Sequence, residues 1–165
     1  MDRKGSILIV DDGAGPRESL RMILQPMYEV HTVENGQEAI KFISQNKVDL
    51  VTLDLKMPGL SGIEVLQEIK KLQPDIEIII VPGYGTLKNA QEAIRFGAVD
   101  LISKPFYAVD IIATVGKAFE RRSYNLKIKG LIQQIQDLHS SFGENNQAKE
   151  RFGTIANRRS REEED

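Results

Sequence analysis

The amino-acid sequence predicts an α/β fold in which a doubly wound, five-stranded parallel sheet is followed by an extended C-terminal helix. Three observations support this prediction. Short apolar runs recur at regular spacing, segments with helical periodicity lie between them, and an apolar stripe continues beyond the last run. Strands that alternate with helices form parallel sheets with right-handed crossovers and helices on both faces. The expected strand order is 2-1-3-4-5, a common doubly wound arrangement.

Five segments have the pattern of strands. The run over residues 28–33 alternates between apolar and polar side chains, as a half-exposed edge strand does. The other four are short apolar runs of the kind that is buried on both faces of a parallel sheet, and they cover residues 6–10, 48–53, 76–81 and 98–102.

The helices between these strands have recognisable starts and stops. Pro16 occupies a first-turn position, where a backbone N–H would have no partner inside the helix. Residues 35–38 and 61–64 have the sequence of capping boxes, with Asn or Ser followed three residues later by Glu. Gly97 is a typical helix stop, because glycine readily adopts the conformation that ends a helix.

Apolar residues continue at helical spacing after Val109, beyond the length that would cover the sheet. They fall on alternating three- and four-residue steps, as coiled-coil core positions do: Tyr124, Ile128, Leu131, Ile135, Leu138 and Phe142. We interpret this stripe as a dimerisation segment, and the alternative is a helix that folds back onto its own domain. The predicted organisation is a domain over residues 1–120, a helical extension over 121–142, and a polar, frayed or disordered tail over 143–165.

The composition is typical of a cytoplasmic protein and excludes several classes of function. Of the 165 residues, 41% are hydrophobic and 28% are charged, and the formal net charge is -2, so no broad attraction to nucleic acid or anionic membrane is expected. The sequence has no cysteine, which excludes disulfides, thiolate metal sites and cysteine nucleophiles. It shows neither a signal peptide nor an apolar run of membrane-spanning length.

Acidic residues follow two strands that we expect to be neighbours in the sheet. Asp11 and Asp12 end the first strand, Asp54 ends the third, and Lys104 follows the fifth. Ligands of doubly wound sheets bind beyond the carboxyl ends of the strands, where the strand order reverses, which here lies between strands one and three. The three carboxylates and the lysine are therefore expected to share one pocket.

Such a pocket favours a divalent cation and phosphoryl chemistry. Three carboxylates packed together repel one another, and oxygen ligands without cysteine or clustered histidine favour Mg²⁺ or Mn²⁺. The cation and Lys104 together would balance the three aspartate charges. A phosphoryl group that arrives on a carboxylate would meet both, and the resulting acyl phosphate is reactive and reversible, as a switch requires.

Several longer motifs match one protein family. They read ILIVDD at 7–12, ENGQEAI at 34–40, VDLVTLDLKMPGLSGIEVL at 48–66, GYGTLKNAQEAIRFGA at 83–98 and SKPF at 103–106. Through these motifs, residues 5–120 resemble the receiver domain of bacterial two-component response regulators. They look closest to receivers that precede helical linkers in enhancer-dependent transcriptional activators or multidomain output proteins. The resemblance implies a flavodoxin-like fold, and a sensor histidine kinase or phosphotransfer protein as partner.

The resemblance also implies a role for each residue of the pocket. Asp54 would be the phosphoacceptor, and Lys104 would bind the phosphoryl group through its ammonium. The peptide bond from Lys104 to Pro105 would be cis. The implied metal ligands are Asp12 and Asp54 directly, Asp11 through water, and the backbone carbonyl of Lys56.

Two positions depart from the family pattern. The family carries Thr or Ser at the end of strand four, where this chain has Pro82, which has neither a hydroxyl nor an N–H, although the Gly83 amide could still donate to a phosphoryl oxygen. At the usual switching aromatic of strand five this chain has Leu101. Phosphorylation is therefore expected, with weakened switching. Lys56 and Tyr84 lie at rim positions that flank the path of the attacking water in this family.

Other functions are left as alternatives. The first is a receiver-like dimerisation scaffold that works without phosphorylation, which the residues at positions 82 and 101 favour. Direct DNA binding is not expected, because the tail over 143–165 has five basic and six acidic residues and no helix-turn-helix pattern. A phosphatase of the dehalogenase type would need a second acid where Lys56 stands. Any enzymatic activity is expected to be limited to autophosphorylation from small donors and autodephosphorylation.

Overall fold

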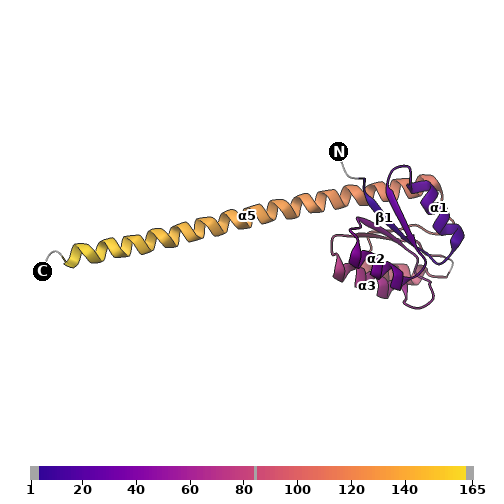
Figure 1. Cartoon of the computed structure of the whole chain (residues 1–165), viewed down its shortest axis with the longest axis horizontal. Coiled ribbons are helices and arrows are strands. Elements are labelled where there is room, and N and C mark those ends of the chain that lie inside the picture. The colour runs from indigo at the N-terminus through magenta and orange to yellow at the C-terminus, as the bar shows by residue number, and fades with distance from the viewer. Residues whose placement is uncertain (1–3, 84, 163–165) are drawn as a thin grey trace. The chain divides into compact units, whose positions relative to one another are not determined.

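A computed structural model of the chain describes residues 4–83 and 85–162. Strands and helices alternate along the chain (Figure 1). The five strands form one parallel sheet in the order β2-β1-β3-β4-β5. This is the predicted fold class and the predicted strand order. The strands are β1 Ser6–Val10, β2 Glu29–Val33, β3 Leu50–Leu53, β4 Glu77–Ile80 and β5 Asp100–Leu101. The helices are α1 Ala14–Leu24, α2 Gly36–Gln45, α3 Gly62–Leu72, α4 Leu87–Arg95 and α5 Ala108–Glu162.

The two faces of the sheet carry separate apolar cores. Buried side chains of α2, α3 and α4 pack on one face, among them Ile43, Leu66 and Ala93. Side chains of α1 and of the first part of α5 pack on the other face, among them Leu24 and Val115. Residues of the central strands are fully buried because helices cover both faces, which explains why their sequences read as continuous apolar runs. Strand β2 lies at the edge of the sheet and is only half-buried, as predicted, although its exposure does not alternate strictly, since Val30 and His31 are both half-buried.

The strand register brings the carboxyl ends of β1 and β3 together. Val10, the last residue of β1, pairs with Leu53, the last residue of β3. The backbone N–H of Asp54 then donates to the Val10 carbonyl at 3.0 Å, which continues the ladder by one residue. The residues that follow these two strands therefore start from adjacent points at one edge of the sheet.

The predicted helix signals are confirmed, with one change of partner. Ser61 and Glu64 form a complete capping box at the start of α3. At α2 the Asn35 side chain accepts a hydrogen bond from the Glu38 N–H, but the Glu38 carboxylate accepts from the N–H of Glu34 rather than from that of Asn35. Gly97 follows α4 with a φ of 109°, a left-handed conformation that favours glycine.

Helix α5 extends further than the sequence indicated. The sequence predicts a frayed or disordered tail over 143–165, whereas α5 continues to Glu162. Its last turns are rich in Ala, Glu, Gln, Lys and Arg, which have high helix propensity, and no proline interrupts them. The chain divides into two compact units after Ser123 rather than near residue 120. Within the described part of the chain, no helix is both long and apolar enough to cross a membrane.

An ion pair fastens α5 to the amino edge of the sheet within the first unit. The Arg122 guanidinium lies 3.2 Å from the Asp49 carboxylate and donates to the backbone carbonyl of Asp75 at 3.2 Å. Asp49 also accepts the N–H of Ser6, the first residue of β1, at 2.8 Å. Both charged side chains are largely withdrawn from water. Removing one of them is therefore expected to lower the free energy of unfolding more than breaking an exposed pair would.

Replacing Arg122 is therefore expected to destabilise the first unit. Arg122→Gln leaves the largely buried Asp49 carboxylate without this charged partner, and the free energy of unfolding should fall by about 2 kcal/mol. The matched control is Arg121→Gln, which removes the same charge from an exposed neighbouring position. Urea denaturation measures both variants, and equal unfolding free energies for the two would contradict the structural role of the pair.

Candidate functional site

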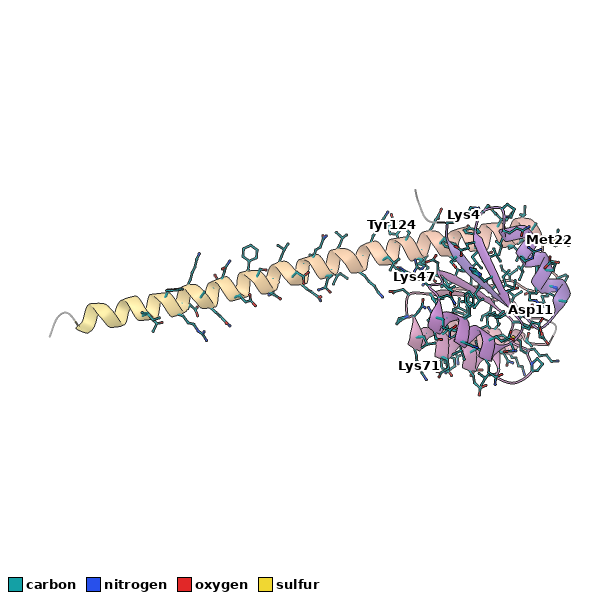
Figure 2. The ribbon with its side chains drawn as sticks, in the orientation of Figure 1. Lys4, Asp11, Met22, Lys47, Lys71 and Tyr124 are labelled. Atoms are coloured by element: carbon teal, nitrogen blue, oxygen red, sulfur yellow. The ribbon has the colours of Figure 1, made fainter. Side chains whose placement is uncertain are left out.

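Three carboxylates meet at the carboxyl edge of the sheet. Asp11 and Asp12 follow β1 and Asp54 follows β3, and one carboxylate oxygen from each lies within 4.8 Å of the others. Asp11 lies at the end of the sheet opposite Lys4 and Lys47, which precede β1 and β3 (Figure 2). The structure thus brings together the three acids that the sequence placed in one pocket.

Asp54 is held by the loop that follows its strand. Its side chain is buried and accepts the backbone N–H of Lys56 at 3.2 Å. The start of α3 packs directly against this segment, since a Cβ atom on Gly62 would come within 2.8 Å of the Asp54 carbonyl oxygen. Only glycine allows this approach, so the residue at position 62 helps to fix the backbone that presents Asp54.

Asp11 is the most enclosed member of the cluster and lies next to the predicted lysine. One carboxylate oxygen, Oδ1, accepts the Gly13 N–H at 2.8 Å. The other, Oδ2, lies 2.7 Å from the Lys104 Nζ, and the same ammonium lies 3.5 Å from the Asp54 Oδ2. Lys104 is placed by its own backbone, because its N–H donates to the Pro82 carbonyl at 3.0 Å and its bond to Pro105 is cis, as expected.

The environment of Asp54 makes its ionisation unfavourable relative to an exposed aspartate. Burial raises the pKa of the Asp54 carboxyl above its ordinary value. The Lys104 ammonium and the Lys56 N–H lower this pKa, and the nearby Asp11 carboxylate raises it. Burial is the largest of these effects, so the pKa of Asp54 stays raised although the Lys104 ammonium is close.

The donor set fits a hard divalent cation. All three side chains offer carboxylate oxygens, and Asp12 is exposed while the other two are buried. Asp11 Oδ2 is buried and accepts no well-aligned hydrogen bond from any described residue, so it has coordination capacity to spare. Carboxylate and carbonyl oxygens suit Mg²⁺ and Mn²⁺.

The residues predicted to affect switching belong to β5 and to the segment after β4, the strand that lies between β3 and β5 in the sheet. Pro82 is buried, and Leu101 is partly buried against the core formed with α2, α3 and α4. Gly83 is partly exposed, and its carbonyl accepts the hydroxyl of Thr86 at 2.8 Å. The Thr86 hydroxyl therefore donates its hydrogen bond within the loop that precedes α4. Tyr84, also predicted at the rim, lies outside the described residues.

Sequence reasoning missed one cation beside the cluster. Arg17, in the first part of α1, donates to the Asp11 carbonyl at 2.9 Å and pairs with Glu34 at 3.1 Å. A basic residue about one helical turn after a pair of strand-end aspartates was the available signal.

Comparisons with known proteins identify the family of this chain. A sequence profile described as the response regulator receiver domain matches residues 7–116. The chemotaxis protein CheY of Thermotoga maritima is 38% identical over 113 residues, which cover 67% of this chain and 94% of that protein. Sporulation initiation phosphotransferase F of Bacillus subtilis is 36% identical over 118 residues, which cover 71% of this chain and 95% of the relative.

Solved structures give the same result for the fold. A response regulator receiver domain protein from Clostridium thermocellum superposes with a TM-score of 0.69 at 34% identity, covering 73% of this chain and 98% of that one. Longer regulators also match, and the chain spans only 26% of the length of the regulatory protein LuxO of Vibrio cholerae. From the matched profile, the fold and these relatives, the chain belongs to the response regulator receiver domains, the signalling domains of two-component systems.

Proposed function

We propose that this domain accepts a phosphoryl group on Asp54 from a sensor histidine kinase or a phosphotransfer protein in the cytoplasm. The observation that carries the proposal is the buried Asp54 carboxylate at the carboxyl edge of the sheet, close to the Asp11 carboxylate and 3.5 Å from the Lys104 ammonium. The name of the Bacillus subtilis relative, a phosphotransferase, is consistent with it. Activity beyond autophosphorylation from small donors and autodephosphorylation is not part of the proposal.

The transfer step uses the side chains in the following way. A carboxylate oxygen of Asp54 attacks the phosphorus of a phosphohistidine, the phosphorus–nitrogen bond breaks, and the imidazole leaves with the electron pair and takes up a proton. Lys104 binds a phosphoryl oxygen and offsets its charge. Asp11, Asp12, Asp54 and the Lys56 carbonyl would hold Mg²⁺ or Mn²⁺, which when bound neutralises charge on the phosphoryl oxygens. The product is an acyl phosphate on Asp54.

The output surface proposed here is the exposed stripe of α5. Its members have no covering element in the described chain, and Ile135 and Phe142 are 65% and 67% exposed. Ile at two core positions and Leu at the two alternate positions is the pattern of a parallel two-stranded coiled coil. A second copy of the chain would cover this stripe, so we propose a homodimer through the C-terminal helix.

A scaffold that works without phosphorylation is the second candidate. Pro82 favours it, because the residue next to the Lys104 backbone offers neither a hydroxyl nor an N–H to a phosphoryl oxygen. Leu101 likewise cannot act as a switching aromatic. The three clustered carboxylates and Lys104 favour the phosphoacceptor, since a scaffold has no need of them.

Acetyl phosphate tests the central proposal. With Mg²⁺ present, the intact mass of the chain should increase by one phosphoryl group, because Asp54 is the nucleophile, and the Asp54→Ala variant should show no such increase. A folded chain that binds Mg²⁺ and acquires no phosphoryl group would favour the scaffold instead.

The affinity for Mg²⁺ should depend on pH in a way set by Asp54. A protonated carboxyl cannot bind the cation, and burial places the pKa of Asp54 above that of an ordinary aspartate. Affinity should therefore decline, as pH falls, sooner than it would for aspartates that titrate near 3.9. Calorimetric titrations at several pH values measure this, with circular dichroism to verify folding. An affinity that stays constant down to about pH 4 would contradict the assignment.

Pro82→Thr tests whether the missing hydroxyl weakens switching. A hydrogen bond to a charged group contributes about 1.5–3 kcal/mol, so phosphorylation should tighten dimerisation about tenfold more in the variant than in the parent. Analytical ultracentrifugation with and without acetyl phosphate gives the dissociation constants, and Ile135→Asp is the control that removes association through α5. Equal responses in parent and variant would show that Pro82 does not limit coupling.

A further inference from the structure

Arg17 connects three segments of the chain next to the acidic cluster. Its NH1 group donates to the backbone carbonyl of Asp11 at 2.9 Å, and its NH2 group pairs with Glu34 Oε1 at 3.1 Å. The Arg17 side chain is only 17% exposed, whereas that of Glu34 is 69% exposed. The guanidinium therefore lies against the protein, between the end of β1 and the residue that follows β2.

The bond to Asp11 fixes a particular peptide plane. The Asp11 carbonyl belongs to the peptide group that joins Asp11 to Asp12, and that group is planar. The same residue donates its N–H to the Val33 carbonyl at 3.3 Å and accepts the Gly13 N–H through its side chain at 2.8 Å. Arg17 thus constrains the orientation of the peptide group that leads into Asp12.

Glu34, the second partner of Arg17, lies in a turn that has hydrogen bonds of its own. The Glu34 N–H donates to the Glu38 carboxylate at 3.1 Å, and the Glu38 N–H donates to the Asn35 side chain at 2.9 Å. Glu34 and Asn35 also line a pocket together with Asp12, Pro58 and Gly59. Arg17 is therefore held from the side of α2 as well as from that of β1.

The geometry points to Arg17 as a positioning residue that holds Asp11 and Asp12 in place for the divalent cation. This inference rests on the magnesium site proposed above. Two effects of the guanidinium oppose each other: its charge repels a cation, whereas its hydrogen bond orders the backbone between two ligands. If positioning dominates, removing Arg17 lowers the affinity for Mg²⁺, and if charge dominates, removing it raises the affinity. The sign of the change separates the two roles.

The test is a Mg²⁺ titration of the full chain, in which NMR or calorimetry measures the binding. Arg17→Gln is expected to weaken Mg²⁺ binding about tenfold or more, as loss of groups that orient metal ligands does. The matched control is Arg21→Gln, which removes the same charge one turn later on α1, where the arginine pairs with Glu18. The control should stay within about twofold of the parent, because an exposed charge is screened by salt. Unchanged or tighter binding by Arg17→Gln would overturn the inference.

Further variants control for the change in net charge and for a possible failure of Arg17→Gln to fold. The double variant Arg17→Gln/Glu34→Gln leaves the net charge unchanged, so weaker Mg²⁺ binding there reports position alone, and parent-like binding would overturn the inference. If Arg17→Gln does not fold, Arg17→Lys decides: it keeps the charge but cannot hold both acceptors, and parent-like Mg²⁺ binding would overturn the inference.

A metal-free measurement adds a readout that does not depend on the cation. Hydrogen exchange of the Gly13 N–H should become faster in Arg17→Gln than in the parent and in Arg21→Gln, because the turn is no longer held. Equal exchange in all three would count against the positioning role. A parent chain that binds no Mg²⁺ would instead refute the proposed metal site, so the two failures are distinguishable.

Discussion

Repulsion between carboxylates at the end of the sheet is the constraint on which the rest of the site depends. The parallel register of β1 and β3 leaves no freedom to separate them, since residues that follow paired strand ends begin side by side. Each surrounding feature offsets this repulsion: the Lys104 ammonium, the N–H groups of Gly13 and Lys56, and the opening toward solvent at Asp12. Burial adds to the effect of this repulsion, and it is the main reason why the pKa of Asp54 is raised although Lys104 is close. The divalent cation that we propose for this site would supply further positive charge.

The sequence was sufficient to predict the sheet and the acidic cluster because both follow from short-range patterns. Buried parallel strands read as apolar runs, and a doubly wound order places the ends of strands one and three together. The Ser61–Glu64 capping box likewise depends on residues three apart, and it is present. Roles that came from family resemblance, such as that of the Lys56 carbonyl, remain predictions.

Contacts between distant side chains could not be predicted in the same way. Arg17 reaches Glu34 and Arg122 reaches Asp49 only because of how α1 and α5 are rotated against the sheet, and a pattern of apolar residues fixes that rotation too coarsely to identify a polar pair. The helix over residues 143–162 has a different origin. Apolar residues are sparse there, but helix formation depends on backbone propensity, to which the Ala, Glu, Gln, Lys and Arg residues of the segment contribute.

The two cores differ in what they connect. The layer on one face consists of α1 and the first part of α5, whose side chains, including Leu20 and Ile111, share a single apolar cluster. Helix α1 also carries Arg17, which contacts the backbone of the acidic cluster. Close-packed interiors are nearly incompressible, so a displacement of one helix in a layer of two must be taken up by the other or by the sheet. Helix α5, which carries the C-terminal extension, thus packs in the same apolar core as α1, which contacts the acidic cluster. This connection does not involve Pro82 or Leu101.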